Sequence, residues 1–346
     1  MKSLEQVRLE LLKSQSGRRR ENSSTGFVKM TGLGSGPLPL VVEPDIDGVD
    51  LPFWARENLE IIEQHLLKHG AILFRGFDVL TQAGFQRFLN SVNADLMEYN
   101  ESATPRTRLG GNIYTSTEFP AKQSIALHNE LSYALTYPMR VWFLCLQSPP
   151  KGGETPIADV RKVYELIGPK ATERFIRKGW MLVRNFGNGL GPSWQSSYHV
   201  NEKGSAEELF RRTKIEFEWR GEDGLRTRQV RPAVSKHPAT GEKVWFNHVA
   251  FWHVSSLEPE VREPMLRLFD EEDLPYNTYY GDGSPIECSI LDDLREAYRQ
   301  STVAFAWQKG DLLMLENMLV AHGRRPFEGS RRILAAMGQP FTRTDT

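Results

Sequence analysis

Short apolar runs separated by turn-forming residues are the feature that most restricts the fold of this chain. A run such as VWFLCLQ has the length of a buried strand and is followed by the turn-like SPPKGG. The predicted strands lie at 71–77, 141–147, 179–187, 302–306, 311–316 and 331–338. So many short strands predict a β-rich core such as a double-sheet jelly roll.

Segments in which apolar residues recur with helical spacing accompany these strands. In residues 51–70, Leu59, Ile62 and Leu66 fall on one side, and Gly70 follows as a C-terminal stop. The predicted helices lie at 51–70, 83–93, 159–167, 170–178, 257–269 and 290–299. We therefore expect a mainly β protein with surrounding helices.

The chain is long enough for one large domain. It has 346 residues, of which 40% are hydrophobic. Residues 1–26 read as a short helix followed by a polar, flexible arm, which leaves 27–346 as a single domain. Residues 187–200 are rich in glycine and serine, and a connection of that length inside a compact domain predicts a functional lid.

Charge and cysteine content exclude several classes of protein. The formal net charge of -1 gives no overall field that would attract nucleic acid or an acidic membrane. No apolar run approaches the roughly 20 residues needed to span a bilayer. With only Cys145 and Cys288, no disulfide framework is expected. We expect a cytoplasmic protein.

One alternating stretch, IALHNELSYA (125–134), carries candidate metal ligands. On a strand, His128 and Glu130 share a face and lie about 7 Å apart at the backbone. The loop after the strand in 310–327 offers His322 as a third ligand. Iron(II) bound by two histidines and one carboxylate keeps open positions on the opposite face, whereas zinc prefers four ligands. Alone, the His-x-Glu pattern also fits a half-buried polar pair.

The other histidines are weaker candidates for metal ligands. His65 and His69 lie four apart on a predicted helix, but their surroundings predict a solvated face. His237 lies in a turn-like segment. His248 and His253 stand between bulky aromatic residues and are interpreted as pocket-wall or core residues.

A carboxylate clamp is predicted near the candidate metal ligands. Thr155 follows a Gly-Gly turn, and Arg332 begins a strand ten residues after His322. An arginine fork binds a carboxylate bidentately, and a threonine hydroxyl completes the grip. A facial metal site with such a clamp describes a pocket for a dicarboxylate whose other end chelates the metal.

In order and spacing, these motifs resemble the iron(II)/2-oxoglutarate-dependent dioxygenases of the TauD/TfdA-like superfamily. The matching motifs are HNE at 128–130, GGET at 152–155, HGRRPF at 322–327 and RRI at 331–333, with HLLKHGAILFRGF at 65–77 similar to the family's N-terminal strand. The resemblance covers about residues 40–342. Residues 111–133 resemble the subgroup associated with nonribosomal peptide biosynthesis, including syringomycin-type aspartyl hydroxylases.

The resemblance implies a double-stranded β-helix fold and specific roles for the motif residues. His128, Glu130 and His322 would hold iron, and Thr155 and Arg332 would hold the C5 carboxylate of 2-oxoglutarate, with O2 as the oxidant.

Two positions separate this chain from other members of the superfamily. Most members have aspartate at the position of Glu130, but glutamate occurs in clavaminate-synthase-like and syringomycin-like members. Related halogenases have a small residue there. Taurine-type enzymes hold a sulfonate with an arginine four residues after the 2-oxoglutarate arginine, where this chain has Ala336. A sulfonate substrate is therefore not expected.

The resemblance implies an oxygenase that couples oxidative decarboxylation of 2-oxoglutarate to oxidation of an unactivated C–H bond. We expect hydroxylation of an amino acid, free or tethered to a peptidyl carrier protein, in antibiotic or other specialised-metabolite biosynthesis. Alternatives within the same chemistry are desaturation, cyclisation, or oxidation of another small carboxylic acid. A zinc hydrolase or cupin-type isomerase would not need the clamp, and a non-catalytic binding protein would form no succinate.

Candidate substrate-binding residues are polar residues that flank the predicted iron strand, precede the predicted lid or lie among the aromatic residues of 245–252. They are Asn112, Ser116, Arg140, Arg184 and His248. The sequence does not predict the oligomeric state.

Overall fold

The computed structural model describes residues 26–34, 36–99 and 106–344. Nearly all of the predicted N-terminal helix and arm, residues 1–26, therefore lies outside the described residues.

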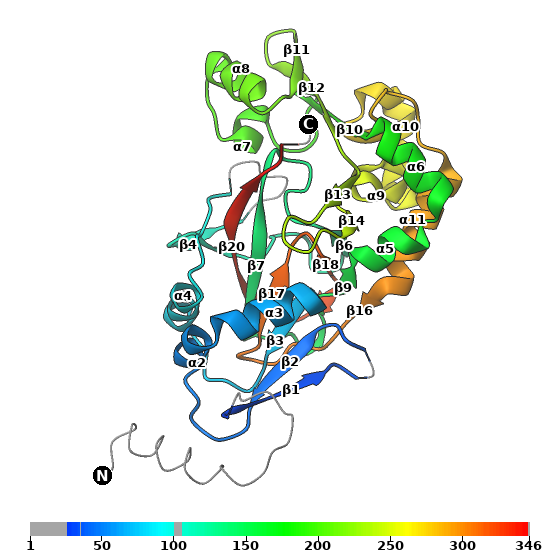
Figure 1. Ribbon diagram of the computed structural model, residues 1–346. Coiled ribbons are helices and arrows are strands. Elements are labelled where there is room, and N and C mark those ends of the chain that lie inside the picture. The colour runs from blue at the N-terminus through cyan, green and yellow to red at the C-terminus, as the bar shows by residue number, and fades with distance from the viewer. Residues whose placement is uncertain (1–25, 35, 100–105, 345–346) are drawn as a thin grey trace.

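The largest element is an eight-stranded sheet. Its strands, in spatial order, are β1 (Val28–Gly32), β2 (Leu40–Pro44), β3 (Ala71–Phe74), β17 (Leu312–Glu316), β7 (Thr136–Gln147), β20 (Arg332–Thr342), β5 (Ile113–Thr115) and β4 (Arg108–Gly110). All neighbours are antiparallel except β2 and β3. The long β7–β20 ladder, which runs from Gln147↔Arg332 to Thr136↔Thr342, forms the centre of the molecule (Figure 1).

A second sheet of four short strands completes the jelly-roll core predicted from the sequence. Its order is β16 (Thr302–Val303), β9 (Ile157–Asp159), β18 (Val320–Arg324) and β6 (Ile125–His128). Two small ribbons flank the core, β8 (Lys151–Gly152) with β19 (Phe327–Glu328), and β13 (Val234–Lys236) with β14 (Lys243–Trp245).

Strand β7 shows why the sequence pattern produces two layers of core. Its side chains alternate between the two faces of the sheet, and both faces are buried. Val141, Phe143 and Cys145 pack on the side of the second sheet, whereas Trp142 and Leu144 pack on the opposite side. An uninterrupted apolar run therefore becomes a strand that is covered on both faces.

Helices cover the two sides of the jelly roll. Figure 1 shows α2 (Leu51–Glu57), α3 (Leu59–His69) and α4 (Gln82–Ser91) on one side. On the other side are α5 (Val160–Leu166), α6 (Pro169–Lys178), α9 (Val249–Trp252), α10 (Pro259–Leu268) and α11 (Cys288–Ser301). Two short 3-10 helices, Val254–Ser256 and Glu271–Asp273, lie in the connections.

The predicted helix over 51–70 is wrong in one respect, because it is two helices. Asn58 leaves helical geometry between α2 and α3, and its side-chain amide donates to the Trp54 carbonyl, which ends the first helix. The stop at Gly70 is confirmed, since this residue adopts the left-handed conformation that glycine tolerates best.

A separate outer lobe stands at one end of the molecule. It consists of β11 (Glu216–Arg220), β12 (Gly224–Arg231), β10 (Trp180–Phe186) and β15 (Tyr276–Tyr280), with α7 (Trp194–Tyr198) and α8 (Lys203–Arg212). Figure 1 shows α7, α8, β11 and β12 projecting beyond the ends of β7 and β20. This lobe has its own small apolar cluster, built around Trp194, Tyr198 and Phe210.

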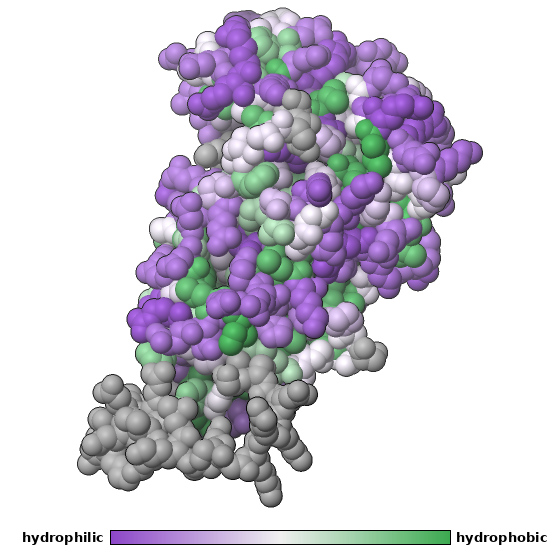
Figure 2. All heavy atoms as spheres, viewed as in Figure 1, coloured by the Kyte–Doolittle hydropathy of each residue, from purple (hydrophilic) through white to green (hydrophobic). Residues whose placement is uncertain are grey.

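The surface in Figure 2 is mostly hydrophilic, and apolar side chains are scattered over it. Within the described ranges, no helix has the length and apolar character needed to cross a membrane.

Candidate metal centre and co-substrate pocket

Two neighbouring strands bring the predicted metal ligands together. His322 lies on β18 directly opposite His128, the last residue of β6, and their ring centroids are 4.6 Å apart. Potential ligand atoms of His128, Glu130 and His322 all lie within 4.8 Å of one another. The prediction that His322 lies in a loop is wrong, because that residue is held in the ladder between β6 and β9.

Alternation predicted that His128 and Glu130 lie on the same strand, and this prediction is wrong. Strand β6 ends at His128, and Glu130 lies in the turn that follows. The next residue, Leu131, adopts a left-handed φ of 53°. The turn, rather than strand periodicity, directs the carboxylate back toward the two imidazoles.

Asn317 fixes this turn from the end of β17. Its side-chain oxygen accepts from the Glu130 N–H at 2.7 Å, and its Nδ2 donates to the Glu130 carbonyl at 2.9 Å. Its own carbonyl accepts from the Asn129 side chain at 2.6 Å. Asn317 is fully buried, so these bonds do not compete with solvent.

The protonation states at this site suit a divalent metal. Burial raises the pKa of Glu130, but the neighbouring Arg106 guanidinium and the two histidines outweigh it and bring the pKa to about 2. Burial lowers the pKa of His128, and it lowers that of His322 to about 3. A carboxylate and two neutral imidazoles are the forms that bind a metal ion.

A pocket extends from the metal ligands toward Thr155 and Arg331. Arg331 is largely buried, and burial lowers its pKa to about 10. Its Nε donates to the Gly153 carbonyl at 3.0 Å and its Nη1 to Ser116 Oγ at 3.3 Å. Among the described residues, no carboxylate pairs with this guanidinium, so the pocket has the charge that an anionic ligand requires.

Thr155 occupies the place predicted for it. It is 3% exposed and lines the same pocket. Its Oγ1 accepts a hydrogen bond from Trp307 Nε1 at 3.1 Å, which leaves the hydroxyl proton available for an acceptor in the pocket.

The prediction that Arg332 belongs to the clamp is wrong. Arg332 is exposed, whereas its neighbour Arg331 lines the pocket. Adjacent side chains in extended chain point in opposite directions, so only one of the pair can face inward. The register of the pairing between β20 and β7 also shifts between Arg332 and Ile333, so the direction of a side chain cannot be predicted from its position in the sequence alone. Four residues after Arg331 is Ala335, also a buried alanine, so the argument against a sulfonate substrate stands.

The predicted substrate residues separate into three groups. Ser116 lines the co-substrate pocket, where it accepts from Arg331. Asn112 lies in the β4–β5 turn, bonded to the Leu96 carbonyl and to Arg108, and does not reach the pocket.

Arg140 is also wrong as a substrate contact. It is buried on β7 in an ion cluster with Glu63 and Glu316, and Glu316 lies 3.3 Å from His237. His237 is therefore a buried member of this cluster rather than an exposed turn residue.

His248 and Arg184 form part of an aromatic wall beside the metal ligands. The His248 ring centroid is 5.7 Å from that of His128, and its Nδ1 lies 2.6 Å from Ser132 Oγ. Arg184 is 6% exposed and stacks on Phe186 at 4.7 Å and on Trp252 at 5.9 Å.

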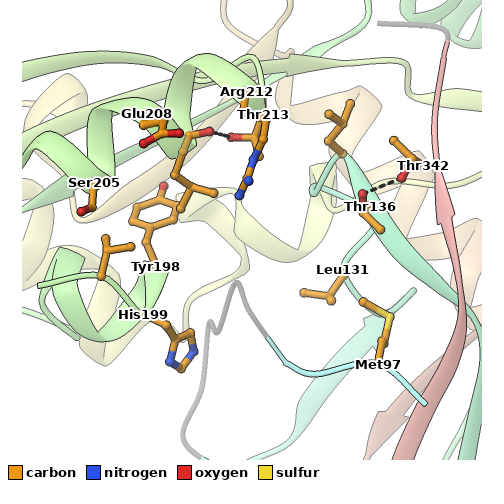
Figure 3. Close-up of a pocket in the computed structure, with 13 residues that line it drawn as sticks. Met97, Leu131, Thr136, Tyr198, His199, Ser205, Glu208, Arg212, Thr213 and Thr342 are labelled. Atoms are coloured by element: carbon orange, nitrogen blue, oxygen red, sulfur yellow. Dashed lines mark hydrogen bonds between the residues drawn. The ribbon is translucent and has the colours of Figure 1, made fainter. Parts of the chain in front are cut away.

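A cavity of about 650 Å³ opens between the outer lobe and the jelly roll (Figure 3). Tyr198 and His199 line it from the lobe, and Leu131 and Met97 line it from the opposite side. Leu131 directly follows Glu130. The Arg184 guanidinium carbon lies 5.5 Å from the centroid of the Tyr198 ring. The cavity is therefore adjacent to both the metal turn and the aromatic wall.

Sequence reasoning missed Arg106 and Asn317. Arg106 lies in an irregular segment without periodicity, and Asn317 makes contacts that span most of the chain. The only sequence signal was that each is a polar residue next to a predicted element, which is too common to single them out.

Comparison with known proteins agrees with this geometry. Residues 34–337 match the model of the Taurine catabolism dioxygenase TauD, TfdA family. The dapdiamide synthesis protein DdaC of Enterobacter agglomerans is 36% identical over 279 residues, which is 81% of this chain and 85% of that relative. The clavaminate synthase-like protein At3g21360 of Arabidopsis thaliana is 30% identical over 321 residues, covering 88% and 94%.

Solved structures show the same fold. PvcB of Pseudomonas aeruginosa superposes with a TM-score of 0.55 at 18% identity, covering 93% of this chain and 95% of PvcB. A second PvcB structure is described as an Fe, alpha-ketoglutarate dependent oxygenase from an isonitrile synthetic pathway, with a TM-score of 0.53 at 16% identity, covering 93% and 94%. The His-Glu-His cluster fits the iron site of such enzymes. The chain belongs to the TauD/TfdA family and is an Fe(II)/2-oxoglutarate-dependent dioxygenase.

Proposed function

We propose that this enzyme hydroxylates an amino acid, with an aspartate-like substrate as the first choice. The observation that supports it is Arg184, a buried guanidinium in the aromatic wall. Its Nη2 donates to Ser197 Oγ at 3.0 Å, an acceptor without charge, and no carboxylate among the described residues pairs with it. A buried unpaired cation is costly, so this position favours a substrate that brings a carboxylate.

Each side of the metal would then have its own anion-binding group. On one side, Arg331 and Thr155 would hold the C5 carboxylate of 2-oxoglutarate. On the other, Arg184 would hold a substrate carboxylate, and His248 with Phe251 would form the wall against which the substrate carbon rests. When bound, the iron and 2-oxoglutarate supply the oxidising power, and the protein supplies orientation and exclusion of water.

The cavity beside the outer lobe suits a substrate larger than a free amino acid. Its volume of about 650 Å³ lies in the middle of the range for small-molecule sites. An aminoacyl group tethered to a peptidyl carrier protein would use this space for its arm. Two similar proteins bear names from biosynthesis, one from dapdiamide synthesis and one from an isonitrile synthetic pathway. We therefore place this enzyme in specialised-metabolite or antibiotic biosynthesis, working in the cytoplasm.

The same site also fits oxidation of a small carboxylic acid that is not an amino acid. Arg184 would bind its carboxylate in the same way, so this is the second candidate. Desaturation and cyclisation use the same residues and differ only in the fate of the substrate after hydrogen removal.

The test is product mass. The full-length enzyme is incubated with Fe(II), 2-oxoglutarate and O2, together with free amino acids or with the same residues loaded on a carrier protein. We expect L-aspartate, free or tethered, to gain one oxygen atom with matching formation of succinate. A gain of oxygen only on an acid without an amino group would contradict the amino-acid proposal and support the second candidate.

A further inference from the structure

Arg106 is a buried cation that lies outside the motifs carrying the metal ligands and the carboxylate clamp. Its side chain is 4% exposed, and its Nη2 lies 2.8 Å from Glu130 Oε2. The guanidinium stacks on the Tyr99 ring at 4.6 Å. Its Nε and Nη1 are buried and have no hydrogen-bond partner among the described residues.

Two unsatisfied donors make this an expensive arrangement. A buried donor without an acceptor destabilises the folded state, and it does so more strongly when the group is charged. Arginine carries five N–H donors in a rigid fork, so one edge can hold Glu130 while another stays free for a second acceptor. The free edge is therefore the part of Arg106 whose role needs an explanation.

The ion pair with Glu130 does not by itself account for the charge. Once a divalent ion binds the triad, the single negative charge of Glu130 is shared between the metal and Arg106. The two cations together then carry more positive charge than one carboxylate can balance, and their repulsion is strong in a buried site. A further anion next to the metal would relieve it.

Arg106 and Arg331 line the same pocket through different contacts. Both line it, together with Thr155 and the two histidine ligands. Arg106 interacts with Glu130, whereas Arg331 contacts Gly153 and Ser116. A ligand that reaches from the metal to Arg331 would thus meet the Arg106 guanidinium beside Glu130 and the Arg331 guanidinium beside Gly153 and Ser116.

We propose that Arg106 binds the C1 carboxylate of 2-oxoglutarate, the carboxylate that lies on the metal. One edge of its guanidinium holds the free oxygen of Glu130, and the Nε/Nη1 edge donates to the incoming carboxylate. Arg106 thereby contacts both a metal ligand and the co-substrate. The 2-oxo acid completes the hydrogen bonds of Arg106 and balances the positive charge of Arg106 and the metal. This inference rests on the proposed placement of the C5 carboxylate at Arg331 and Thr155, and is independent of the oxidised substrate.

The test compares two acids that share the C1 end. Full-length enzyme is loaded with Fe(II) without oxygen and titrated with 2-oxoglutarate or with pyruvate, which lacks the distal carboxylate. Binding is followed by the visible absorption that appears when a 2-oxo acid chelates Fe(II), and bound iron is measured separately. The variants are Arg106→Met, Arg106→Lys and Arg331→Met.

We expect Arg106→Met to weaken both acids by the same factor, about tenfold or more, because it removes charge-assisted bonds to the end they share. Arg331→Met should weaken 2-oxoglutarate and leave pyruvate within about twofold. Arg106→Lys keeps the charge but cannot bridge two carboxylates, so both acids should again bind more weakly.

Pyruvate binding as tight as in the wild type would overturn the proposal, in Arg106→Met or, if that variant fails to keep iron, in Arg106→Lys. Weaker binding of 2-oxoglutarate alone would also overturn it, because that pattern belongs to the C5 end. No amino acid is present in these titrations, so the result does not depend on the proposed hydroxylation.

Discussion

The jelly-roll interior and the outer lobe meet at the active site, but they are built differently. In the interior, His128 and His322 face each other across a strand ladder, and Asn317 locks the turn that carries Glu130. In the outer lobe, a glycine-containing connection leads into the short helix α7, which packs on a small cluster of its own. The difference teaches that the metal-binding residues rest on strands and a turn held by hydrogen bonds, whereas the proposed substrate side rests on a lobe with its own apolar cluster.

Removing a metal ligand is the strongest test of the interior. We expect His128→Ala, Glu130→Ala and His322→Ala each to lower turnover by at least roughly a hundredfold, because outer-shell changes alone cost about 10–100-fold. Circular dichroism should be unchanged, since the core is packed by other residues. His69→Ala on α3 is the matched control, because this histidine bonds to the Pro37 carbonyl away from the metal. Full turnover with normal iron content in any ligand variant would remove that residue from the site.

The adjacent arginines give the sharpest internal control. We expect Arg331→Met to weaken 2-oxoglutarate binding by roughly 100-fold, because a charge-assisted pair in a buried pocket is lost. Arg332→Met should change it by less than about twofold, since that side chain is exposed. Calorimetric titration of the metal-loaded protein measures both. A larger loss of affinity in Arg332→Met than in Arg331→Met would show that Arg332 binds the carboxylate.

The outer side of the site should respond through substrate rather than co-substrate. We expect Arg184→Met to raise the KM for a carboxylate-bearing substrate by about 10–100-fold, because a buried charge pair is lost. Affinity for 2-oxoglutarate should stay at the wild-type value. Arg212→Met, at the rim of the cavity, is the control and should have a smaller effect. A change in 2-oxoglutarate affinity in Arg184→Met would mean that the two sides of the site are not independent.

The smallest expected effect concerns residues 187–200, which we propose act as a lid. Gly189 and Gly191 adopt left-handed conformations and have open space around them, whereas Trp194 and Tyr198 are buried. We expect proteolytic cleavage near the glycines to slow by a few-fold when substrate and 2-oxoglutarate bind. Mass analysis of the fragments locates the cut. Cleavage at the same rate with and without ligands would leave this segment as a fixed part of the lobe.

Motif spacing was enough to predict the jelly roll, the cluster of three metal ligands and the position of Thr155 beside them. It succeeded because the spacing of these residues reflects the register of strands that pack in the core. It failed where a shift of one residue decides which side chain faces the pocket, as at Arg331 and Arg332, next to a shift in the strand pairing.

Residues whose roles depend on distant partners were also beyond the sequence. The sequence predicted that Arg140 contacts the substrate, but in the fold it pairs with Glu63 and Glu316. Arg106 lies outside the regular elements, so no periodicity shows that it turns toward Glu130.

The hydrogen bonds between Asn317 and Glu130 have a consequence for the order of folding. These two residues are separated by 187 residues, and His322 pairs with His128 over a similar span. Closing so long a loop is entropically costly and slow, so these contacts form after local structure. Until β17 and β18 dock, His128 and Glu130 lack both the third ligand and the bond that orients the carboxylate. We therefore expect the complete metal site to form only once the two sheets of the jelly roll have come together.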